Sequence, residues 1–566
     1  MFNSNTNIHS GAYFITLVLI AMSLPLSKYT MSMTEFMLLG MWLLSGFSFS
    51  IVWRFFKIGG FFKGIYHFVE YFFSLAYRNL IDKFSLFFRN RAAVVFASIY
   101  FMHLVGILFT ADYEYALKDL RIKLPLLLFP VVFSTMEKIE YKRFRILMLA
   151  YTASILAGTL ISMGIFFQAE YVDIREISPF ISSIRFSLNT SFAFFALVYF
   201  IIYDKQFKAW HKISFALIAA WFVVFLFILE SVTGLGIIVV IGVSYLVLQL
   251  FKTHYLYLKL TFIVLAVGIP LSLFLYVQHT IHVATHVAPV NMEQLDKYTA
   301  QGNLYVNDTS QTNIEDGRYI GLYICYEELG ESWEKRSDLK IDEESQNGQI
   351  IRETLIRYLT SKDLRKDAEG VEALTDWDIG KIEEGVANYN YLKYPGLRVR
   401  ILKILIGYDV YKKTGDPSGS SVMQRIEYSK ASFDLIHDHF WFGVGTGDLE
   451  DALNDQYKRM GSELKKRYRF HAHNQFLAIF IAFGVFGFLW FLVALIYPPF
   501  KQKNFGDYFF VTFFLVAVFS MLSDDTLETQ AGVTFFAFFY AFLLFGKEKR
   551  NARPKIGTVG STKNDN

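Results

Sequence analysis

The sequence has little of what soluble enzymes use for redox or metal chemistry. Its 566 residues include one cysteine, Cys325, so an intramolecular disulfide and a CxxC metal site are excluded. Ionisable residues are nearly absent from the middles of the long apolar runs, where a coupled transporter usually keeps a few. No internal repeat with matching Gly- or Pro-broken runs is present, which also argues against a transporter. The formal net charge of +4 does not by itself indicate nucleic-acid binding, and we expect no nucleic-acid partner.

Apolar and aromatic residues are abundant instead. Hydrophobic residues make up 54% of the chain and aromatic residues 18%, with 60 Phe and 34 Tyr. These residues come in long blocks, and a membrane-spanning helix needs about 20 mostly apolar residues. The composition therefore predicts an all-α polytopic membrane protein with about twelve transmembrane helices. We expect them at 12–27, 34–53, 93–110, 122–136, 145–168, 187–203, 213–229, 233–251, 260–278, 474–497, 508–523 and 531–545.

The polar segments suggest four regions. Residues 1–278 hold the first nine predicted transmembrane helices, and residues 474–546 hold the last three. The intervening residues 279–473 are rich in Asp, Glu and Lys, and apolar residues spaced three and four apart predict a mostly helical inserted domain. Residues 547–566 form a basic tail. The stretch FFKGIYHFVEYFFSLAYRNLIDKFSLFF, between the second and third predicted spans, is regularly interrupted by charge, which favours an interfacial helix.

The charges of the short loops predict the orientation. With the N-terminus in the cytoplasm, most Lys and Arg residues of the short loops fall on the inner side, as the positive-inside rule requires. The large segment 279–473 is then periplasmic and the tail cytoplasmic.

Four basic residues run against this trend at the predicted outer face. Arg185 stands just before a span, Arg425 begins the helix QRIEYSKASFDLIHDHF, and Arg121 with Lys123 lies at a membrane boundary. A guanidinium group binds phosphate through two parallel hydrogen bonds, so Arg185 is a candidate phosphate ligand. The alternatives are interfacial snorkelling or a lipid-phosphate contact for Arg185, and a solvated ion pair for Arg425.

Two histidines stand at the mouth of an apolar run. His471 and His473 precede Asn474, and an imidazole is a natural general base near neutral pH. An interfacial or capping role is the alternative. No further ligands follow at the usual spacing, so we expect no zinc site. The upstream turn FGVGTGD could expose N–H groups to phosphate, but a plain helix-to-helix turn is the better interpretation.

Three acidic residues, Asp524, Asp525 and Glu528, lie in the last predicted outer turn. They could orient His473 or hold sugar hydroxyls, and the alternative is a solvated turn that caps the final helix.

In this order the motifs resemble a known family. The sequence RFS at Arg185, the helix at Arg425, the GVGTGD turn, the block HAHNQFLAIFIAFGVFGFL and the ending SDDTLETQAGVTFF resemble the O-antigen ligase and O-antigen polymerase superfamily of bacterial membrane glycosyltransferases, in a Bacteroidetes-like variant. The resemblance covers most of the chain and is strongest over residues 421–545.

The resemblance implies a donor glycan on a polyprenyl diphosphate carrier, in the outer leaflet of the inner membrane, and an acceptor such as lipid A–core or another glycan. It implies metal-independent, inverting transfer without a cofactor. His473, or else His471, would be the base. Arg185, Arg425, Arg121 and Lys123 would bind the diphosphate. Supporting residues would be Tyr428, Asn474, Asp524, Asp525 and Glu528.

Other functions stay open at this point. A polysaccharide polymerase and a protein O-glycosyltransferase share the same motifs. A transporter or flippase with an extracytoplasmic domain, and a membrane sensor, are alternatives of other classes.

Overall fold

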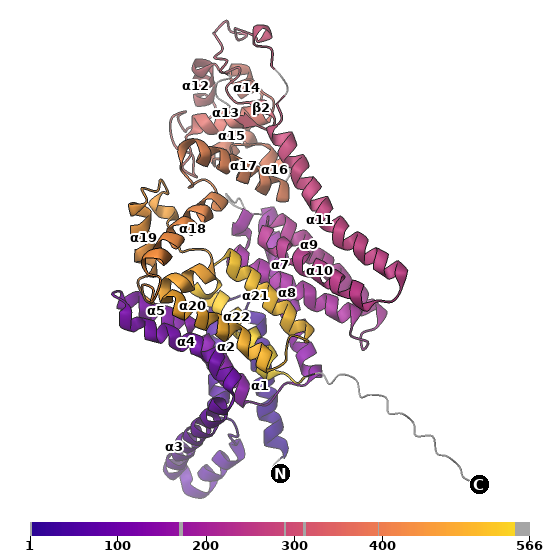
Figure 1. Cartoon of the computed structure of the whole chain (residues 1–566), viewed down its shortest axis with the longest axis vertical. Helices are drawn as coiled ribbons and strands as arrows, with labels where there is room; N and C mark the ends of the chain where they lie inside the picture. Colours follow the sequence, from indigo (N-terminus) through magenta and orange to yellow (C-terminus); the bar gives the residue numbers. More distant parts are fainter. Residues whose placement is uncertain (1–2, 169–173, 288–289, 309–312, 394–395, 550–566) are drawn as a thin grey trace, which may run out of the picture.

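Helices dominate the computed structural model, which describes residues 3–168, 174–287, 290–308, 313–393 and 396–549 (Figure 1). Seven helices are long and apolar enough to cross a membrane. They are α4 with the short helix η1 (Arg91–Gly106 and Ile107–Phe109), α7 (Tyr141–Gln168), α8 (Ser183–Ile202), α9 (Ala209–Ile228), α10 (Val232–Lys252), α11 (Leu256–Thr285) and α20 (Gln475–Lys501). The predicted all-α polytopic membrane fold is confirmed.

Shorter apolar helices complete the bundle. They are α1 (Asn3–Ser23), α21 (Tyr508–Ser523) and α22 (Gln530–Ala541), the last continued by a π-helical turn (Phe542–Gly546). Polar residues begin several of these helices, because a side-chain oxygen at the cap accepts from an unpaired backbone N–H group. Asp507 caps α21 and Thr529 caps α22 in this way. The total of twelve membrane crossings stays a prediction.

The predicted span 34–53 is wrong in its bounds. Its residues belong to α2 (Lys28–Leu43) and to the start of α3 (Phe49–Arg89), with a turn between them. The side chain of Ser27 caps α2, so the helix begins early. The amide of Asn79 donates to the carbonyls of Leu43 and Ser45, which fixes the chain reversal.

The helix at the predicted span 122–136 is also shorter than predicted. Its helical part is α6 (Pro125–Thr135), because Lys123 is the last residue of the separate helix α5 (Tyr113–Lys123) and Pro125 is well suited to begin a new helix.

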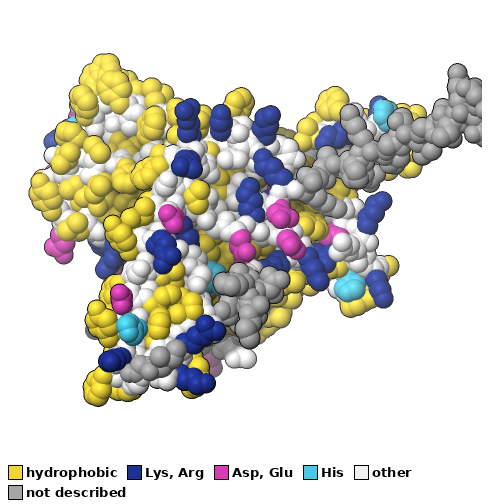
Figure 2. All heavy atoms as spheres, turned by 90° about the horizontal axis from the view of Figure 1, so that it is seen from below, with side chains coloured by type: hydrophobic (Ala, Val, Ile, Leu, Met, Phe, Trp, Pro, Cys, Tyr) yellow, Lys and Arg dark blue, Asp and Glu magenta, His cyan; other side chains and the backbone are white. Residues whose placement is uncertain are grey.

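One end of the bundle is basic. The loops there contact each other: Nη1 of Arg145 lies 3.6 Å from Oδ2 of Asp204, and Nζ of Lys547 lies 2.7 Å from Oδ2 of Asp507. Figure 2 shows Lys and Arg side chains gathered on this face. The inserted segment stands at the opposite end (Figure 1), so the predicted charge asymmetry has a spatial counterpart.

The inserted segment 279–473 contains two hydrophobic clusters. One surrounds the buried Trp333, and the other joins Tyr428 and Tyr457 to α20. The elements of this region are η3 (Met292–Gln294), β1 (Ile314–Glu315), β2 (Arg318–Tyr319), α12 (Tyr326–Glu334), α13 (Ile351–Ser361), α14 (Ala368–Glu372), α15 (Asp376–Glu383), α16 (Asn390–Lys393), α17 (Leu397–Thr414), α18 (Ser421–Asp438), α19 (Leu449–Arg459) and η4 (Lys466–Tyr468). Antiparallel pairing of β1 with β2 makes a minimal hairpin. The two remaining short helices are η2 (Ile174–Ile177) and η5 (Thr526–Glu528).

The predicted division at 278/279 and 473/474 stays a prediction. The tail beyond residue 549 lies outside the described residues.

The glycine-rich turn FGVGTGD, which follows α18, is hydrogen-bonded to α20 at the point where that helix is interrupted. Gly484 has φ 61° inside α20, so the helix is interrupted there. The N–H groups of Val444 and Gly445 donate to the carbonyls of Ile481 and Ala482, each at 2.9 Å. In a membrane, backbone groups freed by a broken helix need partners of this kind. Because these N–H groups are already used, the turn is a structural joint, in agreement with the plain-turn interpretation.

Gly443→Ala tests this joint. Gly443 has φ 73°, and an added Cβ would lie 2.4 Å from the backbone of Ala482. We expect a loss of more than about 1 kcal/mol of stability, since the strain of positive φ alone costs about that much. The thermal unfolding midpoint in detergent measures it. Gly461→Ala is the matched control, because Gly461 also has positive φ but open space around it. Equal midpoints for the two variants would contradict the close fit.

Candidate functional site

His473 lies at the entrance of α20, held by the capping residue next to it. The side chain of Asn474 accepts from the N–H groups of Phe476 and Leu477, and its amide donates to the carbonyl of Leu522. His473 itself has φ 47°, a left-handed conformation that is uncommon for a residue with a side chain. Strained backbone of this kind gathers at functional sites. The side chain is 27% exposed, so the ring is fixed but reachable.

Asp524 contacts both His473 and Arg185. Its Oδ1 lies 3.0 Å from Nδ1 of His473, and its Oδ2 lies 3.2 Å from Nη2 of Arg185. Burial opposes ionisation of Asp524, but the hydrogen bond from His473 and the charge of Arg185 lower the pKa of this carboxyl well below its usual value. An ionised carboxylate only accepts hydrogen bonds. Nδ1 therefore carries a proton, and Nε2 of a neutral His473 is left with a free lone pair.

Arg185 reaches this site from the first turn of α8. Its Nη1 donates to Oγ of Ser182 at 3.0 Å, and its Nη2 faces the carbonyl of Asp525. Its Nε is buried and has no hydrogen-bond partner among the described residues. The guanidinium group is thus held by one carboxylate and keeps an unused donor.

Tyr428 and Arg425 come from α18. The ring of Tyr428 stacks on His473, with ring centroids 5.3 Å apart, and its hydroxyl donates to the carbonyl of Tyr468 at 2.6 Å. Burial raises the pKa of Tyr428, and the nearby charge of Arg425 opposes that rise. Arg425 lies one helical turn from Tyr428 and makes no ion pair within the described part of the chain. The structure therefore places a cation without a carboxylate partner beside the ring that covers His473.

His471 points elsewhere. Its Nε2 lies 3.4 Å from the hydroxyl of Tyr115, and its buried Nδ1 has no partner among the described residues. No carboxylate orients its ring as Asp524 orients that of His473.

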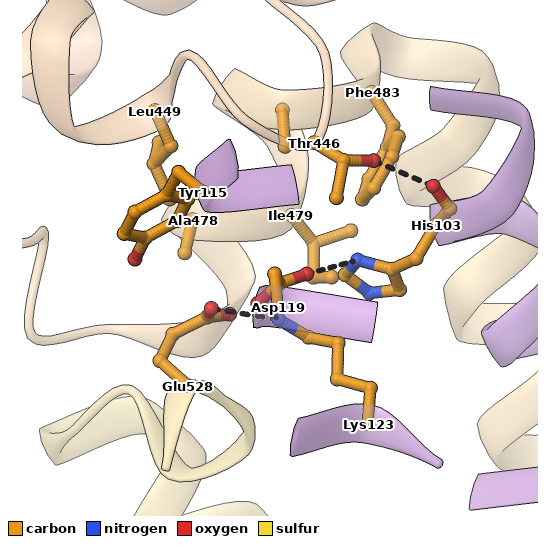
Figure 3. A pocket seen from close by; sticks show the side chains of 11 residues that line it. His103, Tyr115, Asp119, Lys123, Thr446, Leu449, Ala478, Ile479, Phe483 and Glu528 are labelled. Atoms are coloured by element: carbon orange, nitrogen blue, oxygen red, sulfur yellow. Dashed lines mark hydrogen bonds and ion pairs between the residues drawn. The ribbon is translucent and has the colours of Figure 1, made fainter. Parts of the chain in front are cut away.

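Lys123 is buried in a separate ionic cluster, which Figure 3 shows. Its Nζ donates to Asp119 and, at 2.8 Å, to Oε2 of Glu528, and the side chain is only 1% exposed. Nδ1 of His103 lies 3.3 Å from the other oxygen of Asp119. Arg121, on the same helix α5, is exposed. The two basic residues that we grouped together by sequence therefore lie in different environments.

Gln475 connects this cluster to the histidine. Its Nε2 donates to Oε1 of Glu528 at 2.9 Å, and its Oε1 accepts from the N–H of Leu527 at 2.6 Å. The turn from Asp524 to Glu528 is therefore fixed at both ends, to His473 and Arg185 at one and to Lys123 and Gln475 at the other.

Asp525 is buried beside Asp524. Burial and the negative charge of Asp524 raise the pKa of Asp525 to about 6. His473, Asp524 and Asp525 each offer a ligand atom, and these atoms lie within 4.8 Å of one another. Carboxylates and imidazole are donors that divalent metals accept. The expectation that no metal is needed stays a prediction, and chelation tests it below.

Sequence reasoning missed several residues of this site. Asp119 stands four residues before Lys123 on one helix, a spacing that predicts an ion pair and could have been noticed. Gln475 and Tyr115 carry no comparable signal, because their partners are far away in the sequence.

Part of the chain around the site matches a known protein family. Residues 391–492 match the family model described as O-antigen ligase. This match supports membership of the chain in the O-antigen ligase superfamily. The matched region includes Tyr428, His471 and His473, whereas Arg185 and the turn at Asp524 lie outside it. A search of curated proteins found no match. Membership indicates a membrane glycosyltransferase-type enzyme that acts on polysaccharide or lipid-linked substrates.

Lys123→Met should be strongly destabilising. The change leaves Asp119 and Glu528 buried without their cation, which costs about 3 kcal/mol or more. Thermal unfolding in detergent measures the loss, and Arg121→Met, an exposed change on the same helix, should cost less than about 0.5 kcal/mol. Adding Glu528→Gln to Lys123→Met should restore part of the stability. Similar midpoints for the Lys123 and Arg121 variants would show that the cluster contributes little.

Asp525→Asn should alter the pH dependence of stability. The pKa of Asp525 is about 6 in the folded protein and near 3.8 when unfolded. Between those values the folded state holds a proton that the unfolded state has lost, so the free energy of unfolding falls as pH rises, by on the order of 2 kcal/mol. Asn does not titrate, so the variant should gain stability relative to the wild type as pH rises from about 4 to about 6. Unfolding midpoints of the wild type and the variant, measured across this pH window, test the prediction. Parallel curves for the two proteins would contradict it.

Proposed function

We propose that this protein is an O-antigen ligase-like glycosyltransferase. It moves a glycan from a polyprenyl diphosphate carrier to an acceptor hydroxyl, such as one on lipid A–core, at the periplasmic face of the bacterial inner membrane. The observation that carries the proposal is Asp524, which contacts the imidazole of His473 and the guanidinium of Arg185 together. A base and a phosphate-binding group are then side by side, as the reaction needs.

His473 is the general base of this proposal. The Asp524 carboxylate holds Nδ1 protonated, so Nε2 can take the proton of the acceptor hydroxyl, as in other histidine–carboxylate pairs. Stacking against Tyr428 fixes the plane of the ring. His471 lacks an orienting carboxylate, which favours His473 over it.

Arg185 and Arg425 bind the diphosphate. The acceptor oxygen attacks the anomeric carbon, and the bond from that carbon to the carrier's diphosphate breaks, with its electron pair leaving on the diphosphate. Guanidinium groups stabilise this growing negative charge. Attack from the opposite side to the leaving group inverts the anomeric centre. Arg121 is exposed and can join them, whereas Lys123 already binds two carboxylates and is better assigned to holding the turn.

The sidedness follows from the charge distribution. His473 stands just before the first residue of α20, whereas the loop after the other end of α20 holds Asp507, which pairs with Lys547 at the basic end. Basic loops face the cytoplasm by the positive-inside rule. This charge distribution supports the proposal that the site opens toward the periplasm, where a flipped lipid-linked glycan is available.

His473→Gln tests the mechanism. We expect transfer by the purified protein in vesicles to fall by about 10²- to 10⁴-fold, the usual contribution of a general base. Donor binding should persist, because the arginines remain. His471→Gln, two residues away, is the matched control and should keep most activity. Chelation with EDTA should leave the wild-type rate unchanged.

Other outcomes separate the alternatives. Wild-type transfer by the His473 variant would remove the proposed base. Loss of transfer with EDTA would point to a metal at His473, Asp524 and Asp525. In cells that lack the gene, full-length glycan left on the carrier indicates a ligase, whereas single repeats indicate a polymerase.

A further inference from the structure

Helix α3 forms a hairpin at the basic end of the molecule. Gly60, with φ 69°, breaks the helix into a short and a long limb. The limbs fold back on each other: the ring of Phe55 lies 5.9 Å from that of Tyr71, and the Tyr71 hydroxyl accepts from the N–H of Ser48. Figure 1 shows α3 projecting from the bundle near the N-terminus.

One face of the long limb fixes the hairpin to the bundle. Asn79 donates to the carbonyls of Leu43 and Ser45, and the buried Lys83 donates to the carbonyl of Trp42. Phe87 is buried at the end of the same face. The hairpin is therefore anchored at its base, and its orientation is set.

An adjacent face of the long limb carries an exposed apolar stripe. Its side chains recur three and four residues apart, which places them in one row along the helix. Several are more than half exposed, Phe62 at 85% among them. The stripe consists of Phe62, Tyr66, Val69, Phe73, Tyr77 and Leu80. No described residue covers it, and six large apolar side chains in a row need a partner other than water.

Cations flank the stripe. The exposed basic residues of α3 outnumber its exposed acids, Glu70 and Asp82, by five to two. Arg54 and Lys57 lie on the short limb, and Lys63, Arg78 and Arg89 lie on the long limb, which also carries the two acids. An apolar row with a basic flank is typical of helices that lie in the membrane interface. A second copy of this chain would bring like-charged flanks together, which disfavours a dimer through this face.

We infer that the α3 hairpin is a binding site for anionic phospholipid, on the leaflet at the basic end of the molecule. The stripe enters the acyl-chain region, and the flanking cations contact phosphate headgroups. Aromatic and basic side chains have an apolar body and a polar tip, so side chains of one helix can reach both the acyl-chain region and the headgroups. The inference is independent of the glycan-transfer chemistry at the other end of the bundle.

Site-specific quenching tests the inference on the full-length protein. A fluorophore is attached through Phe73→Cys in the stripe, or through Ser74→Cys on the charged flank as the matched control. The native Cys325 is buried in the inserted segment and is replaced by Ser. The proteins are placed in nanodiscs of phosphatidylcholine with or without phosphatidylglycerol, and lipids with a nitroxide in the acyl chain act as quenchers. We expect quenching at position 73 but not at 74, and stronger quenching with phosphatidylglycerol.

Charge removal then tests lipid selectivity. The double change Lys63→Gln with Arg78→Gln should weaken binding of the α3 hairpin to the lipid of anionic nanodiscs, by about fivefold for each cation lost. Lys205→Gln with Lys208→Gln removes the same charge from another exposed loop of this face and should have no such effect. Quenching that ignores both phosphatidylglycerol and the α3 charges would overturn the anionic-lipid site. Absence of quenching at 73, or cross-linked dimers through that cysteine, would overturn membrane docking itself.

Discussion

The arrangement of the site depends on one buried carboxylate, that of Asp524. A carboxylate removed from water must be neutralised or it loses its charge. Asp524 is neutralised from two sides, by Arg185 at the start of α8 and by His473 at the start of α20. The start of α8, the start of α20 and the end of α21 are thereby held together. The same contact sets the tautomer of His473, so packing and chemistry rest on one interaction.

A second set of interactions keeps the carboxylate in place. Glu528 closes the turn that Asp524 begins, and Lys123 and Gln475 bind it. The glycine-rich turn adds backbone hydrogen bonds into the broken helix α20, and Asp448 after it accepts from the N–H groups of Ala111 and Asp112. Buried polar groups are costly when they lack partners, so these hydrogen bonds and ion pairs hold the outer end of the bundle together.

Much of the architecture was predictable because apolar length and loop charge are local properties. The class of fold, most helix positions and the amphipathic helices at 351–361 and 397–414 follow from such patterns. Arg185 and His473 were also singled out from the sequence, since a cation or a histidine at an outer membrane edge is conspicuous, and both contact Asp524 in the structure. The ion pair of Lys123 with Glu528 was not predictable, because these two residues are 405 positions apart in the sequence. The bounds of α2 were missed for the same reason, as Asn79 and Lys83 fix its end from a distant part of the chain.

Helix α11 has a consequence for the inserted region above it. With 30 residues it is about 45 Å long, whereas the hydrocarbon core of a bilayer is about 30 Å thick. No side chain in its most apolar stretch is fully buried by protein, so much of the helix surface is left for lipid. The N–H of Gly317 in the β1–β2 hairpin donates to the carbonyl of Ala284 in the last turns of α11. The helix thus supports the hairpin from below. An apolar helix longer than the hydrocarbon core is thick tilts in the bilayer. The thickness of the surrounding bilayer therefore helps to set how high the hairpin stands above the membrane.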